Sequence, residues 1–108
     1  MHRARAHSDV FRAIADPTRR ALLDRLREGG RPVGELAAAF RSSRPAISKH
    51  LRVLRQARLV RERREGRIRR YELTPAPLVE AARWIEGYRA FWAMSLEALK
   101  RHLEGTQR

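Results

Sequence analysis

The chain has 108 residues, a length typical of one domain, and its lack of cysteine excludes disulfides, thiolate metal sites and thiol redox chemistry. A net charge of +13 and a sequence pI near 11.7 favour a polyanionic partner, with nucleic acid the first candidate. No apolar run approaches the ~20 residues of a membrane span, and the N-terminus lacks the hydrophobic segment of a secretory signal, so we expect a cytoplasmic protein with no membrane partner.

The first third of the chain predicts a basic arm and two short helices. Residues 1–7 are expected to form a loosely ordered arm, and a helix follows over about 8–15. Asp16 is a good N-cap and Pro17 a good first helical residue, so a second helix begins there and ends before the glycine pair 29–30. The apolar side chains expected to face inward from these helices are Val10, Phe11, Ile14, Ala15, Ala21, Leu22, Leu23 and Leu26.

Residues 34–57 have the pattern of a helix-turn-helix. A short helix is followed by a tight turn and by a second helix that begins at Ser43, a good N-cap. Ile47, Leu51 and Leu54 give this second helix one apolar face, and small polar or basic side chains cover its opposite face. Such a face suits a helix that enters the major groove of double-stranded DNA. The residues of this helix expected at DNA are Ser43, Arg44, Pro45, Ala46, Ser48, Lys49 and Arg52.

The pattern then changes to a period of two and predicts a β-hairpin over 59–73, with a turn at Glu65 and Gly66. The segment 41–70 carries 12 basic and 2 acidic residues, for a net charge of +10. We interpret the hairpin as a wing that lies on the phosphate backbone or probes the minor groove. The alternative is an edge hairpin whose charges only prevent aggregation. The wing residues expected at DNA are Arg63, Arg64, Arg67, Arg69 and Arg70.

Residues 78–103 predict one long helix with an apolar stripe. Large apolar side chains recur there at steps of three and four residues, and the helix would be ~39 Å long, more than one small core can cover. We therefore expect the stripe to join two copies of the chain, although it could also pack only on its own domain. The residues expected in the dimer interface are Phe11, Trp84, Ile85, Tyr88, Trp92, Leu96 and Leu99.

These elements predict a mainly α-helical fold with a small β-hairpin. The whole chain, 1–108, is expected to form a single winged helix-turn-helix domain with about five helices and a two-stranded wing.

The chain resembles the ArsR-type winged-helix repressors in four segments, which cover nearly its whole length in the family's order. They are ADPTRRALLDRLREGG, ELAAAFRSSRPAISKHLRVLRQARLV, EGRIRRYELTP and the final aromatic helix, and the pattern S-x-x-x-I-S-K-H-L-x-V-L in the second is fairly specific. The resemblance implies a homodimer joined mainly through its first and last helices. It also implies that the helix from Ser43 enters the major groove, that the hairpin around Arg67 is the wing, and that binding represses a promoter.

The chain departs from the family in two places. Family members commonly have Ala-Gly-Leu-Val after the recognition helix, whereas residues 57–60 here are Ala-Arg-Leu-Val, so Arg58 either distorts the turn or adds a phosphate contact. The family's metal sensors place cysteine near 35–40, or His and acidic ligands in the last helix. Here the first stretch has no thiol, and His102 is the last helix's single histidine. Because a transition-metal site needs several converging ligands, no metal site and no cofactor are expected, and His50 is expected to be structural or to contact phosphate.

The function expected from the sequence is that of a sequence-specific DNA-binding transcriptional regulator. We expect a homodimeric repressor or autorepressor that binds a palindromic operator without a recognisable metal sensor. The alternative is a winged-helix module for protein or RNA contacts, because the fold alone does not set the function. An enzyme is not expected, since the chain has no Gly-rich phosphate loop, no cysteine nucleophile and no paired carboxylates suited to a cleft. No sequence pattern identifies a small-molecule or protein inducer.

Overall fold

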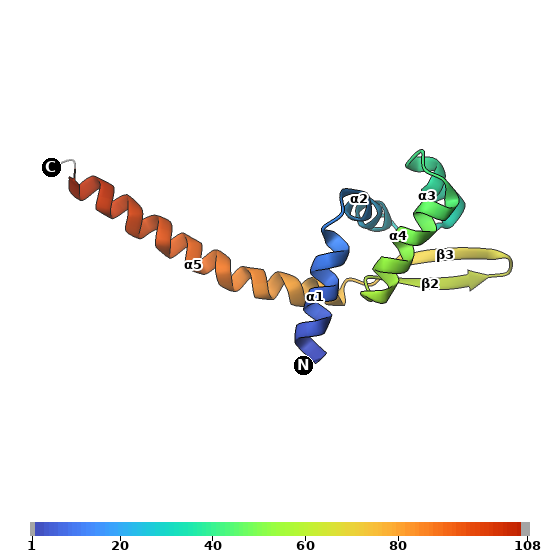
Figure 1. Ribbon diagram of the computed structural model, residues 1–108, viewed down its shortest axis with the longest axis horizontal. Coiled ribbons are helices and arrows are strands. Elements are labelled where there is room, and N and C mark those ends of the chain that lie inside the picture. Colours follow the sequence, from blue (N-terminus) through green and yellow to red (C-terminus); the bar gives the residue numbers. More distant parts are fainter. Residues whose placement is uncertain (1, 107–108) are drawn as a thin grey trace.

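Helices and strands follow one another in the order shown in Figure 1. The computed structural model describes residues 2–106, and it describes side chains over 8–105. The elements are α1 (His2–Ile14), α2 (Pro17–Leu26), β1 (Arg31–Pro32), α3 (Val33–Ala39), α4 (Arg44–Gln56), β2 (Val60–Glu65), β3 (Ile68–Leu73) and α5 (Ala76–Thr106). The predicted fold class is confirmed, with α3 and α4 as the helix-turn-helix and the hairpin β2–β3 as the wing.

Two helix boundaries differ from the sequence prediction. Helix α1 already begins at His2, so the prediction of a loosely ordered arm is wrong for residues 2–7, while Met1 lies outside the described residues. The arm is rich in alanine and arginine, which are strong helix formers, and this local preference extends the helix toward the N-terminus. Helix α5 is also longer than predicted and continues to Thr106.

The hairpin has its turn one residue later than predicted. Strand β2 continues through Glu65, and the two residues that connect the strands are Gly66 and Arg67. Gly66 has a φ of 62°, a left-handed conformation that glycine adopts readily in such short loops. Arg67 therefore lies at the tip of the wing rather than within a strand.

A third strand joins the hairpin, in the order β1-β3-β2. The short strand β1 pairs antiparallel with β3, with Arg31 opposite Tyr71 and Pro32 opposite Arg70. The guanidinium of Arg70 also donates a hydrogen bond of 3.0 Å to the backbone carbonyl of Gly30. This pairing ties the segment before α3 to the wing and was absent from the sequence prediction, which contained only two strands.

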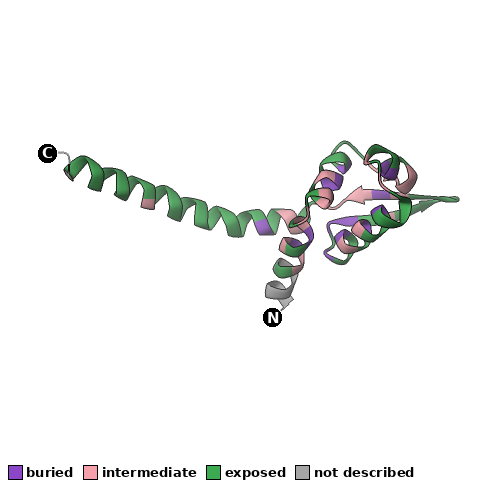
Figure 2. Ribbon diagram, turned by 45° about the horizontal axis from the view of Figure 1, so that its top comes forward, coloured by how far each residue is buried: buried purple, intermediate pink, exposed green. Residues whose placement is uncertain are grey.

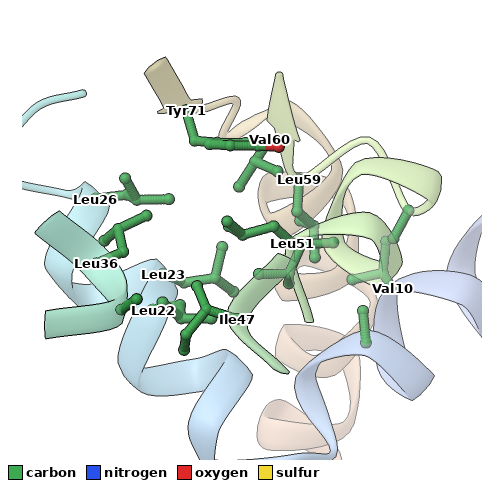
Figure 3. Close-up of a cluster of buried hydrophobic side chains, with 14 of the residues drawn as sticks. Val10, Leu22, Leu23, Leu26, Leu36, Ile47, Leu51, Leu59, Val60 and Tyr71 are labelled. Atoms are coloured by element: carbon green, nitrogen blue, oxygen red, sulfur yellow. The ribbon is translucent and has the colours of Figure 1, made fainter. Parts of the chain in front are cut away.

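The core lies where α1, α2, α3 and α4 meet the base of the hairpin (Figure 3). Burying each large apolar side chain here contributes about 1.5–3 kcal/mol. Sequence periodicity predicted most of these side chains correctly, although Ala15 is exposed because α1 ends at Ile14. The largest fully buried side chains are Val10, Leu22, Leu36, Ile47, Leu51, Leu54 and Leu59.

Both ends of α4 are closed by local hydrogen bonds. The Oγ atom of Ser43 accepts a hydrogen bond of 3.2 Å from the backbone N–H of Ala46, which confirms the predicted N-cap. At the other end, the N–H of Leu59 donates to the carbonyl of Leu54 at 2.9 Å, and Arg58 between them has a φ of 61°. This is a Schellman motif, in which glycine is the usual residue at the left-handed position. Arg58 therefore keeps the turn undistorted, although a side chain in this conformation costs about 1–2 kcal/mol.

Helix α5 leaves the domain after its first turns and extends away on the side opposite the wing (Figures 1 and 2). It contains 31 residues, which corresponds to a length of about 46 Å. Ala81 is its one fully buried residue within the described part of the chain. The rest of α5 lies almost entirely in solvent.

Candidate nucleic-acid interface

Helix α4 has one buried face and one open face. Ile47, Leu51 and Leu54 have no exposed surface and fix the helix to the core. Every side chain of α4 and its N-cap that was expected at DNA from the sequence is exposed, from Ser43 to Arg52. The structure therefore places all seven of these residues in reach of a partner, and their contact with DNA stays a prediction.

The cations of this open face are not neutralised within the protein. Arg44, Lys49 and Arg52 form no ion pair with any residue in the described part of the chain. The guanidinium of Arg44 lies over Gly34 in α3, since a Cβ added to Gly34 would lie 2.5 Å from Nη2 of Arg44. Glycine at this position therefore leaves room for the Arg44 side chain.

Most wing arginines, in contrast, are paired with glutamates of the same hairpin. Arg61 donates two hydrogen bonds to Glu72, at 2.9 and 2.7 Å, and Arg63 donates one at 3.1 Å. The hydrogen bonds from Arg61 lower the pKa of Glu72, with its partial desolvation opposing the change and the charge of Arg63 adding to it. Glu72 lies directly opposite Arg61 in the strand register, a pairing that a correctly placed turn would have predicted.

The remaining wing arginines divide into two groups. Arg69 lies 3.4 Å from Glu62, and Arg70 lies 3.6 Å from Glu65. Arg64 and Arg67 form no ion pair with any described residue. Of the five wing residues expected at DNA, these two are thus free to neutralise a phosphate without first leaving a carboxylate.

His50 connects α4 to the beginning of α2. Its Nδ1 atom lies 3.5 Å from the guanidinium of Arg19 and 3.9 Å from the carboxylate of Asp16. Asp16 is the N-cap of α2 and accepts a hydrogen bond from the backbone N–H of Arg19. This hydrogen bond lowers the pKa of Asp16. Partial desolvation opposes the change, and the charges of His50 and Arg19 add to it. These contacts support the structural role expected for His50.

A hollow of about 860 Å³ lies where the end of α4, strand β2 and the beginning of α5 meet. Its wall contains arginines, two glutamates and apolar residues that include Val10; the charged residues are Arg55, Arg58, Arg61, Arg64, Glu62 and Glu80. Sequence reasoning missed this hollow because its lining comes from α1, α4, β2 and α5, which are far apart in the chain.

Most residues predicted for the dimer interface form an exposed apolar face on α5, and Phe11 of α1 beside them is partly buried. The rings of Phe11 and Trp84 have centroids 5.3 Å apart, so α1 and α5 join in one aromatic cluster, which Tyr88 extends at 4.7 Å from Trp84. Trp84 is 50% exposed and Trp92 is 61% exposed, whereas tryptophan is on average highly buried in folded proteins. Ile85, Tyr88, Leu96 and Leu99 are exposed on the same helix.

Two further structural features bear on the site. Within residues 8–105, whose side chains the structure describes, no three side chains of the His, Cys, Asp or Glu type gather closely enough to hold a metal ion. None of the helices in the described part of the chain combines the length and the apolar content that crossing a bilayer requires.

The chain is similar to known regulatory proteins. A family model described as a helix-turn-helix domain matches residues 14–63. The transcriptional repressor SdpR of Bacillus subtilis is 40% identical over 78 residues, which cover 72% of this chain and 87% of SdpR. The HTH-type transcriptional regulator Rv2034 of Mycobacterium tuberculosis is 42% identical over 92 residues, covering 85% of this chain and 83% of Rv2034. The solved ArsR-like transcriptional regulator from Rhodococcus sp. RHA1 is 34% identical, with a TM-score of 0.75 over 94% of this chain and 95% of that one.

These similarities confirm the resemblance drawn from the sequence segments. The relatives are transcriptional regulators, which is a non-enzymatic role, and the helix-turn-helix implies double-stranded DNA as the partner. The chain belongs to the ArsR family of winged helix-turn-helix transcriptional regulators.

Proposed function

We propose that this chain is a homodimeric repressor that binds a palindromic operator through α4 in the major groove. The observation that carries the proposal is the open face of α4, where Arg44, Lys49 and Arg52 are exposed and form no ion pair with any described residue. Charged groups held on a rigid helix without internal partners lose little when they exchange water for phosphates and base edges.

The wing supplies a second set of contacts. Arg67 at the turn and Arg64 in β2 have no carboxylate partner among the described residues, so they are the first wing residues to reach phosphates. Arg63, Arg69 and Arg70 exchange a glutamate for a phosphate, which makes their contribution smaller. The wing therefore adds mainly sequence-independent affinity, whereas Ser48 and Arg44 of α4 contribute to the choice of sequence.

The apolar face of α5 is covered by a second copy of the chain. Its large side chains run along one side of the helix over several turns, from Trp84 to Leu103, and each is about half exposed or more. A C2 dimer covers such a stripe with an identical stripe, because the same patch on both subunits is self-complementary. Two α4 helices fixed in this way contact half-sites about 34 Å apart, which corresponds to one turn of DNA.

Regulation is proposed to proceed without a metal sensor. The chain has no cysteine, and the described acidic and imidazole side chains do not gather in threes. Borderline and soft transition metals need several convergent nitrogen or sulfur ligands. Addition of zinc, cobalt or nickel at micromolar concentration should leave the DNA affinity of the purified protein unchanged.

Fluorescence anisotropy with two labelled duplexes tests the proposal. One duplex contains the region upstream of the protein's own gene, and the other contains the same bases in shuffled order. We expect the upstream duplex to bind at least ~1000-fold more tightly at physiological salt, the lower range for specific recognition. Equal affinity for both duplexes would contradict a specific repressor. Tighter binding of a labelled single-stranded RNA, titrated in the same way, would favour the winged-helix module for RNA contacts instead.

A further inference from the structure

Two arginines flank α4 and share an unusual backbone conformation. Arg41 precedes the helix with a φ of 51°, and Arg58 follows it with a φ of 61°. Among the residues that the structure describes, no others except glycines have a positive φ. The sequence left two roles open for Arg58 and gave no sign that Arg41 is unusual.

Each arginine occupies the left-handed position of a Schellman motif. At the end of α3, the N–H of Arg41 donates to Ala38 at 3.4 Å, and the N–H of Ser42 donates to Ala37 at 3.2 Å. At the end of α4, the N–H of Arg58 donates to Arg55 at 3.0 Å. These bonds involve the backbone alone, so glycine would form them as well and without steric strain. The fold therefore has no use for an arginine side chain at either position.

The two side chains have no internal partner. Both are exposed, and neither guanidinium forms a hydrogen bond or ion pair with a described residue. Arg58 also lines the hollow, where Arg55 and Arg61 are paired with glutamates and Arg64 forms no ion pair with a described residue. The described part of the protein thus contains no partner that explains why these two left-handed positions carry arginine, where the motif usually has glycine.

The dimensions of α4 suggest an explanation. Its 13 residues span about 20 Å, whereas the major groove is about 12 Å wide. When α4 crosses the groove at an angle, residues just beyond its two ends are therefore close to the two sugar-phosphate backbones that border the groove. We propose that Arg41 and Arg58 bind phosphates and clamp α4 from both ends, an inference that rests on the proposed binding of DNA by α4.

The substitutions Arg41→Gly and Arg58→Gly test this inference in the full chain. Each removes the cation and leaves a residue that favours the observed φ. We expect affinity for operator and for shuffled duplex to fall together, by about five-fold at 0.15 M salt for each phosphate that is no longer bound. The slope of log affinity against log salt should decrease by about 0.9 per phosphate, or about 1.8 in a dimer on two half-sites. The melting temperature should stay the same or rise, because backbone strain is relieved.

Matched variants separate charge from structure. Arg41→Lys and Arg58→Lys retain a cation and should recover most of the affinity and of the salt slope. Arg101→Ala removes one positive charge from the exposed surface of α5 and should change neither.

The outcomes distinguish this inference from the proposed function. Failure of the wild-type protein to bind any duplex would overturn both. Tight wild-type binding with unchanged affinity and salt slope in a glycine variant would overturn the assignment of that arginine alone. A glycine variant that loses affinity together with thermal stability would show a structural role and would likewise overturn it.

Discussion

The winged-helix body, which comprises α1 to β3, buries most of its large apolar side chains, whereas the long helix α5 exposes most of its own. In the body, Leu22, Leu36, Ile47, Leu51, Leu54 and Leu59 have no exposed surface. Eleven large hydrophobic side chains are exposed among the described residues, and ten of them lie on α5, the other being Ile68 in the wing. The body therefore buries its large apolar side chains, with Ala81 of α5 in the same core, whereas most of α5 retains an exposed apolar surface of the kind that marks an interaction site.

The same two regions also differ in net charge, which is strongly positive in the body and close to zero around α5. The segment 41–70 has a net charge of +10, whereas 71–108 has five basic and five acidic residues and a net charge of zero. The surface proposed to bind DNA and the surface proposed to bind a second copy thus lie on separate elements. Variants in one region should leave the property of the other region intact, and this separation can be tested.

Leu51→Ala in the body should have the largest effect on stability. Removing a fully buried leucine side chain leaves a cavity and should lower the free energy of unfolding by about 2–5 kcal/mol. Urea denaturation followed by circular dichroism measures this loss, which should be the same at every protein concentration. Leu99→Ala on α5 is the matched control, because its cost should appear only where the protein is dimeric. An equal and concentration-independent loss in both variants would show that α5 is covered by its own domain.

Trp92→Ala should weaken the dimer without unfolding the body. Tryptophans at the centre of interfaces commonly contribute about 2 kcal/mol or more each, and the substitution removes one from each copy, so we expect the dimer dissociation constant to rise by about 1000-fold. Sedimentation velocity over a dilution series measures this constant. Arg83→Ala, a substitution of an exposed polar residue on α5, should leave it nearly unchanged. A wild-type protein that is monomeric at all concentrations would show that no second copy covers α5.

The sequence predicted the elements whose signals are local. Asp16 and Ser43 were recognised as N-caps because a side-chain oxygen and a nearby N–H are enough to form the cap. The buried stripe of α4 followed from its spacing in the same way. The segment from Arg31 was expected to be extended, but its pairing with β3 was missed because its partner Tyr71 lies 40 positions away and no local pattern specifies that pairing.

The candidate site was predicted less completely than the fold. The sequence identified which cations the wing contains, but their availability depends on strand register. A turn at Glu65 and Gly66 would place Arg61 opposite Arg70, whereas the observed turn places it opposite Glu72. A shift of one residue in the turn therefore decides which charges are neutralised. The left-handed conformation of Arg41 could not be predicted either, because an arginine in the sequence gives no local signal for a positive φ.

Wing and α5 arginines should differ in their effect on DNA binding. Arg67→Ala should lower affinity for all duplexes by about five-fold per phosphate contact and reduce the salt slope by about 0.9 per contact. Arg69→Ala should have a smaller effect, because Arg69 already lies 3.4 Å from Glu62. Arg101→Ala on α5 should have none. Anisotropy titrations at several salt concentrations provide these values, and equal effects of Arg67 and Arg101 would mean that only net charge matters.

The body should also be the region whose stability depends on acidic pH, through Asp16 and Glu72. Both pKa values are lowered in the folded protein, that of Asp16 mainly by the N–H of Arg19 and that of Glu72 mainly by the side chain of Arg61. A carboxylate whose folded pKa is lowered stabilises the protein above its ordinary value, here 3.8 and 4.5, and loses this contribution as the pH falls through the lower folded value. Urea midpoints should therefore decline below about pH 4.5.

Asp16→Asn isolates the charge from the cap, because asparagine retains an acceptor for the N–H of Arg19. This variant should keep most of its stability at pH 7 and should show a shallower decline in acid than the wild-type protein. Glu86→Gln on α5 should retain the wild-type decline, since its pair with Arg89 is exposed at 3.7 Å and such pairs contribute little. If Glu86→Gln flattened the decline as much as Asp16→Asn, acid sensitivity would not be confined to the body. The separation of the two regions would then hold for apolar packing but not for the electrostatics of folding.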